Sequence, residues 1–167
     1  MKPKYQQAHM RAAHIYGELS HARRLKVGAL IVKDDRIISI GYNGMPSGWD
    51  NNCEAVEYMD SDAGGWLDPD EIDAQWPFVD ENNRRYRLKT KPEVLHAETN
   101  AIAKLARSSE SGLNADLFVT HSPCIDCAKI IYQSGISRVF FARAYRDNAG
   151  IDFLKASGVE VLQVTCD

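Results

Sequence analysis

The sequence predicts an α/β fold, in which a mixed five-stranded sheet lies between two helical layers as a three-layer α/β/α sandwich. Three observations support this prediction. The 167 residues suffice for one compact domain with a buried core. Two apolar runs near the N-terminus flank a tight turn, as in an antiparallel hairpin. After Pro92, strand and helix patterns alternate, which requires crossover connections between parallel strands.

The N-terminal part begins with an amphipathic helix over residues 5–19. Apolar residues at helical spacing predict one buried stripe: Ala8, Ala12, Ile15, Tyr16 and Leu19. Residues 27–33 are apolar and β-branched and predict a buried strand, and residues 36–41 predict a second strand. Asp34-Asp35 between them is a turn signal, so the two strands should form a hairpin.

Residues 46–91 differ from the rest of the chain. They are polar and rich in Asp, Asn, Gly and Pro, with tryptophans at scattered positions. A structureless loop of this length would be unusual in a compact domain. We therefore expect one domain over residues 1–167, with residues 46–91 as an insertion packed against it.

The remaining elements alternate regularly along the chain. We expect strands over residues 117–120, 138–142 and 159–164, and helices over residues 96–107, 124–133 and 151–156. Together with the hairpin, these strands make the five strands of the predicted sheet. Gly135 and Gly158 follow two of the helices at the position where glycine commonly ends a helix.

Composition excludes several classes of protein. The net charge of −3 provides no basic field for a nucleic-acid backbone, which also argues against a tRNA editor. No apolar run approaches the roughly 18 residues of a membrane span, and the polar N-terminus does not resemble a signal peptide. Two of the four cysteines form one Cys-x-x-Cys, which argues against a disulfide scaffold and favours a reducing, cytoplasmic setting.

Two short motifs contain residues suited to metal chemistry: His96-Ala97-Glu98 and Pro123-Cys124-Ile125-Asp126-Cys127. Cys124 and Cys127 are three residues apart, about 60° around a helix axis, so both thiols can face one point. With Ser122 as the expected N-cap and Pro123 as the first helical residue, they lie in the first turn. The helix dipole there favours the thiolate form. His96 begins another helix, so we expect two helix N-termini to converge on one ion.

Two thiolates and one imidazole are typical zinc ligands, and three protein ligands leave a fourth position open, as in catalytic zinc sites. Glu98 then remains as a carboxylate that can carry protons. Each motif has other interpretations. Cys-x-x-Cys alone also occurs in redox pairs and zinc knuckles, and a structural four-ligand site would need Cys53, His121 or Cys166 as a further donor.

These motifs resemble the signature of the cytidine deaminase superfamily, H-x-E followed by P-C-x-x-C with a non-ligand Glu as acid/base. Within it the chain is similar to deoxycytidylate (dCMP) deaminases, and its compact size suggests a phage or bacterial member of that family. The segments that carry the resemblance are residues 26–29, 41–46, 96–102, 122–127 and 134–136. They span most of the chain except the insertion. The resemblance implies a cytidine deaminase-like fold.

The resemblance implies roles for the motif residues. His96, Cys124 and Cys127 would bind one catalytic zinc ion per chain, and Glu98 would carry protons while dCMP is hydrolysed to dUMP and ammonia, supplying dUMP for dTMP synthesis. A phage member would act in the host cytoplasm. Cys53 is expected to be a packed thiol, because the insertion contains no histidine to join it in a second zinc site.

Three residues are expected to contact the substrate: Asn43, Ala97 and Tyr145. Asn43 lies in the loop Gly41-Tyr42-Asn43-Gly44 and could bind the sugar, or could be a left-handed turn residue between glycines. Tyr145 follows a predicted strand where the family has a substrate-contacting tyrosine, with ordinary packing as the alternative.

A nucleotide also needs cations for its phosphate. Arg23, Arg24 and Lys26 precede the first strand, and Arg107 ends the motif helix; solvated surface is the alternative for each. The family resemblance implies a homo-hexamer activated by dCTP and inhibited by dTTP, with Mg²⁺ accompanying the triphosphate. These basic residues and Gly44 are therefore candidates for either the substrate phosphate or the effector.

The sequence is also compatible with two other functions. The chain could deaminate another free cytosine nucleoside or nucleotide, or it could be a zinc-binding module without turnover, in which Glu98 is merely an acidic residue at a helix start.

Overall fold

A mixed five-stranded sheet with the strand order β2-β1-β6-β7-β8 forms the centre of the computed structural model, which describes residues 1–60, 67–145 and 147–165. The strands are β1 (Gly28–Lys33), β2 (Arg36–Tyr42), β6 (Asp116–His121), β7 (Arg138–Arg143) and β8 (Glu160–Gln163). β1 pairs antiparallel with β2 and β6, whereas β6-β7 and β7-β8 are parallel. The predicted α/β class and its five-strand mixed sheet are thus confirmed.

The N-terminal hairpin has the predicted turn. Lys33 pairs with Arg36, and the two residues between them, Asp34 and Asp35, have φ values of 50° and 57°. Two positive φ values in a two-residue loop are typical of a type I′ turn, whose twist matches that of the flanking strands. Aspartate adopts positive φ values more readily than most non-glycine residues do. Two aspartates can therefore form this turn without a glycine.

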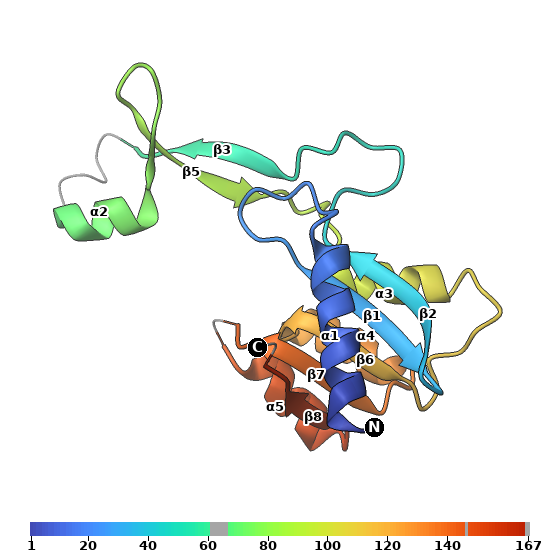
Figure 1. The fold of residues 1–167 in the computed structure, drawn as a ribbon. Coiled ribbons are helices and arrows are strands. Elements are labelled where there is room, and N and C mark those ends of the chain that lie inside the picture. The colour runs from blue at the N-terminus through green and yellow to red at the C-terminus, as the bar shows by residue number, and fades with distance from the viewer. Residues whose placement is uncertain (61–66, 146, 166–167) are drawn as a thin grey trace.

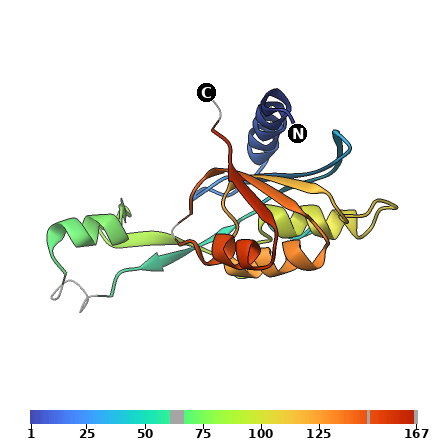
Figure 2. The same cartoon turned by 90° about the horizontal axis from the view of Figure 1, so that it is seen from below.

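Helices cover both faces of the sheet. α1 (Pro3–Gly17) lies on one face, and α3 (Ala97–Leu105), α4 (Ile125–Gln133) and α5 (Ala149–Ala156) lie on the other, which is visible in Figure 2 with α1 in blue. Alternate residues of β1 therefore enter different cores. Ala29 and Ile31 pack with α3 and α4, whereas Leu30 and Val32 pack with α1. The result is a three-layer α/β/α sandwich.

The buried stripe of α1 differs from the prediction. Met10, Ala13 and Gly17 are buried, whereas Ile15 is 64% exposed and Leu19 is 54% exposed. Of the predicted stripe, Ala12 and Tyr16 are partly buried against the core and Ala8 is exposed. The small residues Ala13 and Gly17 allow the helix to approach the sheet closely. The helix therefore turns toward the sheet the side that permits close packing, and the larger apolar residues Ile15 and Leu19 stay exposed.

Residues 54–90 form a projection that we call the arm. It contains a second sheet of β3 (Glu54–Tyr58), β5 (Arg85–Thr90) and β4 (Phe78–Val79), in that order, together with α2 (Pro69–Gln75). Figure 1 shows the arm extending away from the central sheet. The expected packing of residues 46–91 against the domain is therefore wrong for most of the arm, whose described elements contact mainly one another.

The arm is held together by its own strand ladder and by cation–π contacts. Arg87 lies over the Trp76 ring, 4.4 Å from its centroid, and Arg84 lies over Tyr58 at 4.3 Å. These local contacts explain how a sheet that is exposed on much of its surface can form without packing on the body. Within the described ranges, no helix is long and apolar enough to span a membrane.

Candidate metal centre and its cavity

Three side chains of metal-binding type meet beside the central sheet. The ligand atoms of His96, Cys124 and Cys127 all lie within 4.8 Å of one another. The Nδ1 atom of His96 is 3.6 Å from the sulfur of Cys124 and 3.3 Å from that of Cys127. His96 is the N-cap of α3 and Cys124 is the N-cap of α4. Two helix N-termini therefore converge on one point, as the sequence spacing predicts.

The start of α4 differs from the expected one by two residues. Cys124, not Ser122, is the N-cap, and Pro123 lies outside the helix. The Ser122 hydroxyl instead accepts a hydrogen bond from the backbone N–H of Tyr145 at 2.7 Å. The Cys124 side chain makes no capping hydrogen bond. The N–H groups of the first turn therefore add their positive potential at the two thiols.

The protonation of the cluster suits a divalent cation. The pKa of Cys124 falls to about 4, first because Cys127 donates a hydrogen bond to it and then because His96 does so. The pKa of Cys127 is raised, first by the same thiol–thiolate contact and then by burial. The hydrogen bond with Cys124 raises the pKa of His96. A cluster that shares protons between two sulfurs and one nitrogen can exchange them for a metal ion, and this donor set fits zinc better than magnesium.

Glu98 lies next to this cluster in a different environment. It sits in the first turn of α3 and is only 4% exposed, whereas His96, two residues earlier, is exposed. Burial is the largest influence on the Glu98 carboxyl and raises its pKa. A carboxyl with a raised pKa both accepts and releases a proton more readily near neutral pH, which is the property of a general acid–base group.

A cavity of about 400 Å³ opens beside the cluster, a volume in the usual range for small-molecule sites. The residues expected to contact a substrate, Asn43, Ala97 and Tyr145, all line it. So do His96, Glu98 and Cys124. The structure thus brings together the two sequence motifs and two residues from other segments of the chain, Asn43 and Tyr145, although their roles remain predictions.

The predicted phosphate or effector contacts are distributed differently. Arg24 lines the cavity and is the one lysine or arginine among the described residues that does so. Arg23 points to Asn52, with its Nη2 atom 3.3 Å from the side-chain oxygen. Lys26 donates to the carbonyl of Glu18 at 3.2 Å and does not line the cavity.

Gly44 and Arg107 also lie outside the cavity lining. Gly44 forms a backbone bridge with Leu95, in which each residue's N–H donates to the other's carbonyl. Arg107 follows the C-terminal end of α3, opposite the end that carries His96. Of the five candidates, Arg24 is therefore the one that the structure places where a nucleotide in this cavity could reach it.

Asn43 has a bracing function that the sequence did not indicate. Its side-chain oxygen accepts from the N–H of Val27, and its amide donates to the carbonyl of Leu25, both at 2.8 Å. Its φ is not positive, so the left-handed turn alternative is wrong. One Asn side chain can make further hydrogen bonds, so Asn43 can brace the loop and still face a ligand.

Three residues of the site were missed or left open by sequence reasoning. Glu54 and Thr90 line the cavity although both belong to the arm. No local motif marks them, because they reach the site only through the tertiary fold. His121, considered as a fourth ligand, lines the cavity and contacts Thr120, and it lies outside the three-residue cluster.

The remaining cysteines do not join the cluster in the part of the chain that the structure describes. Cys53 is 1% exposed and packs with Ala22 and Val94 in a small apolar core, with its sulfur 3.5 Å from the Asn51 carbonyl. This is the packed thiol that the sequence predicts. Cys166 lies outside the described residues.

Comparisons with known proteins agree with this geometry. Residues 3–143 match the family model described as the cytidine and deoxycytidylate deaminase zinc-binding region. The chain is similar to the deoxycytidylate deaminase of Enterobacteria phage T4, with 33% identity over 173 residues, 93% of this chain and 87% of that protein. It is also 33% identical to ComE operon protein 2 of Bacillus subtilis over 164 residues, covering 98% of this chain and 72% of that protein.

A solved structure extends the similarity to the whole fold. The dCMP deaminase of cyanophage S-TIM5, crystallised with dCMP and dUMP, matches with a TM-score of 0.76 and 39% identity, covering 98% of both chains. The family match spans the N-terminal helix, both metal motifs and most of the central sheet. The chain therefore belongs to the cytidine and deoxycytidylate deaminase family.

Proposed function

We propose that the chain, as a single zinc-dependent domain, deaminates dCMP hydrolytically to dUMP and ammonia. One observation carries this proposal: a single cavity is lined by the metal-type motif residues, by the buried Glu98 and, at its wall, by Arg24. The named activities of the phage relatives support the choice of dCMP. A nucleotide requires both a reaction centre and a cation for its phosphate, and this cavity offers both.

The chain's own residues would divide the work of binding and proton transfer. His96, Cys124 and Cys127 would hold zinc, which when bound supplies Lewis-acid chemistry that increases the acidity of a water molecule beside the base. Glu98 takes one proton from the attacking water and gives it to cytosine N3, which makes C4 more electrophilic. The water oxygen bonds to C4. Glu98 then transfers the remaining proton of that oxygen to the amino group, which leaves as ammonia.

Substrate selection would rest on the cavity wall. Asn43 would contact the sugar, and Tyr145 and Ala97 would also contact the substrate; their positions in the cavity lining support these roles. We assign the substrate phosphate to Arg24, because its guanidinium can donate two parallel hydrogen bonds to phosphate oxygens.

Regulation and assembly belong to the same proposal and rest on the family resemblance. We propose a homo-hexamer that is activated by dCTP and inhibited by dTTP, with Mg²⁺ bound to the triphosphate, and that acts in the cytoplasm. Light scattering measures the assembly directly. Rates measured against dCMP with and without each triphosphate test regulation: a shift of the half-saturating dCMP concentration in opposite directions is expected, and a hyperbolic curve indifferent to both would refute it.

The first experiment measures ammonia release by the zinc-loaded protein from dCMP, deoxycytidine, CMP and cytidine. We expect kcat/KM for dCMP to exceed that for deoxycytidine by roughly a hundredfold, because charge-assisted hydrogen bonds to a phosphate contribute about 1.5–3 kcal/mol each. Equal values would contradict the phosphate requirement and favour another cytosine compound as substrate. Zinc binding without turnover of any of the four would favour a non-catalytic zinc module.

A further inference from the structure

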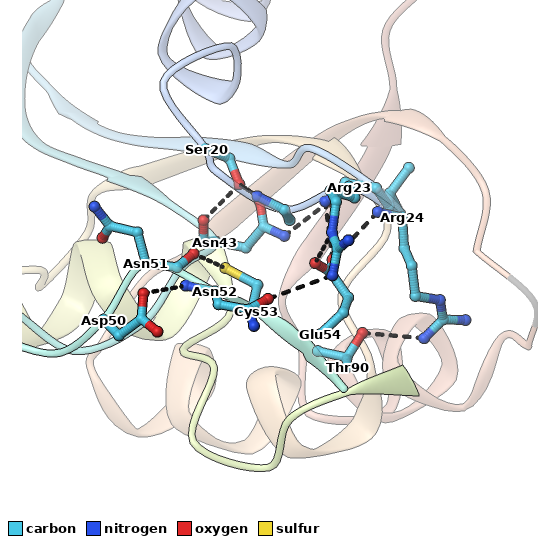
Figure 3. A network of polar contacts seen from close by, with 12 residues as sticks. Ser20, Arg23, Arg24, Asn43, Asp50, Asn51, Asn52, Cys53, Glu54 and Thr90 are labelled. Carbon is cyan, nitrogen blue, oxygen red and sulfur yellow. Dashed lines mark hydrogen bonds and ion pairs between the residues drawn. The ribbon is translucent and has the colours of Figure 1, made fainter. Parts of the chain in front are cut away.

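Glu54 is a buried carboxylate in the cavity wall that the proposed reaction does not use. It is the first residue of β3, and its side chain is 1% exposed. Figure 3 shows its contacts with the loop before β1. One carboxylate oxygen accepts from the backbone N–H groups of Arg23, at 2.9 Å, and Arg24, at 3.2 Å, and the other lies 3.4 Å from Nε of Arg23.

These contacts fix the backbone of the loop. A carboxylate that is removed from water is stable only when hydrogen bonds replace its solvation. In the described structure, two consecutive backbone N–H groups and one guanidinium provide them. Moving the Arg23–Arg24 peptide away would leave this buried charge without its partners, so Glu54 resists such movement.

The other end of Arg24 is held by the same part of the arm. Its guanidinium Nη1 donates to the Thr90 hydroxyl at 3.0 Å (Figure 3). Thr90 is the last residue of β5 and is the direct pairing partner of Glu54 in the β3–β5 ladder. One rung of the arm sheet therefore holds Arg24 at both its backbone and its side chain.

We propose that the Glu54–Thr90 rung is a positioning device that presents Arg24 to the phosphate of the substrate, so that the base of the arm sets the preference for a nucleotide over a nucleoside. This rests on the proposed function, in which Arg24 binds the phosphate. The guanidinium has five N–H donors, and Thr90 occupies one of them, which leaves donors for a phosphate.

The test uses variants that preserve size. Glu54→Gln replaces the charge and sets an amide donor against Arg23, and Thr90→Val removes the hydroxyl but keeps a β-branched side chain. We expect KM for dCMP to rise about fivefold in Glu54→Gln and about threefold in Thr90→Val, with kcat unchanged. KM for deoxycytidine should stay at its wild-type value in both, because that substrate has no phosphate. Bound zinc should stay at one ion per chain.

A double-mutant cycle separates positioning from general stability. Arg24→Ala should raise KM for dCMP by about thirtyfold, and adding Glu54→Gln to it should raise KM no further, because Glu54 acts through Arg24. Glu57→Gln is the matched control: it lies on the same strand, pairs with Arg87 and Lys89 on the arm, and should leave both KM values unchanged. Full additivity, an unchanged KM for dCMP, or equal losses for both substrates would overturn the proposal.

The same measurements keep this proposal separate from the proposed function. If the wild-type protein fails to prefer dCMP over deoxycytidine, the assignment of a phosphate-bearing substrate is wrong, and with it the role of the rung. If the wild-type protein shows the preference and Arg24→Ala raises KM for dCMP, but Glu54→Gln and Thr90→Val leave KM for dCMP at the wild-type value, only the positioning role is wrong.

Discussion

His96 and Glu98 are two residues apart, yet the fold gives them opposite surroundings. His96 is exposed at the N-cap of α3 with its ring toward two thiols, whereas Glu98 is buried in the first turn. In the middle of a helix, such a pair would point to opposite sides. At the helix start, both reach the same cavity. This placement makes one a candidate ligand and the other a candidate proton carrier.

Asn43 connects the segment before β1 to the loop after β2 through two side-chain hydrogen bonds. Asn43→Ala leaves the Leu25 carbonyl and the Val27 N–H without their partner, so we expect a loss of about 2 kcal/mol in the free energy of unfolding, measured in urea. KM for dCMP should also rise, because the braced loop carries Arg24.

Two further variants serve as controls for Asn43→Ala. Asn43→Asp keeps the acceptor for Val27 and should lose less stability than Asn43→Ala. Asn51→Ala, at an exposed loop position, should stay within about 0.5 kcal/mol of wild type. If Asn43→Ala is as stable as Asn51→Ala, the bracing role is refuted.

The chemistry-bearing residues could be predicted from the sequence because their geometry is local. The spacing of Cys124 and Cys127 fixes their relative direction within one helical turn. Glu54 could not be predicted, because its partners Arg23 and Arg24 lie 31 and 30 residues away and only the tertiary fold brings them together. The same limit left five basic or loop candidates for the phosphate or the effector, of which Arg24 lines the cavity.

At the scale of elements, close helix approach determines where the metal motifs lie. A Cβ on Gly41 of β2 would overlap the Ala97 carbonyl at the start of α3. A Cβ on Gly150 of α5 would overlap the Pro123 carbonyl and press on the Cys124 backbone. Both glycines therefore contact the backbone of a motif directly. The starts of α3 and α4 can occupy their positions because the neighbouring element has a glycine at the point of contact.

Gly150→Ala tests this dependence. The new methyl group must displace either α5 or the Pro123–Cys124 backbone, so we expect about 1–3 kcal/mol of destabilisation in urea unfolding and a weaker affinity for zinc in a competition titration. Lys155→Ala, an exposed change on the same helix, should alter neither quantity. Wild-type zinc affinity and stability in Gly150→Ala would show that the contact does not position Cys124.

The elements of the body were predicted from the sequence, and those of the arm were not. Strands of the central sheet have the continuous apolar runs of buried strands, and their helices have clear breakers, so most boundaries fall within two residues of the prediction. In the arm, β3 has no period-two apolar pattern, whereas β5 alternates charged and apolar residues from Arg85 to Lys89, a strand signal that the prediction of an insertion over residues 46–91 did not use. The Ser122 cap failed for another reason: the loop at Tyr145 uses that hydroxyl.

At the scale of the whole molecule, the cavity lies where the body meets the base of the arm. The body contributes the metal-type cluster and Glu98, and the arm contributes Glu54 and Thr90. This division suits the proposed substrate: the reacting base would face the body, and the phosphate would face the loop that the arm holds. The chain has a net charge of −3, and Arg24 at the cavity wall would supply the local positive charge that the proposed anionic substrate needs.

The most direct test of the account is the rate of dUMP formation from dCMP by Glu98→Gln, measured with its zinc content. Glutamine keeps the size of the side chain but cannot carry a proton. We expect one zinc ion per chain, as in the wild-type protein, and a kcat lower by about 10²–10⁴-fold. A Glu98→Gln protein that binds zinc and turns over dCMP at the wild-type rate would contradict the central claim that Glu98 carries the protons of the reaction.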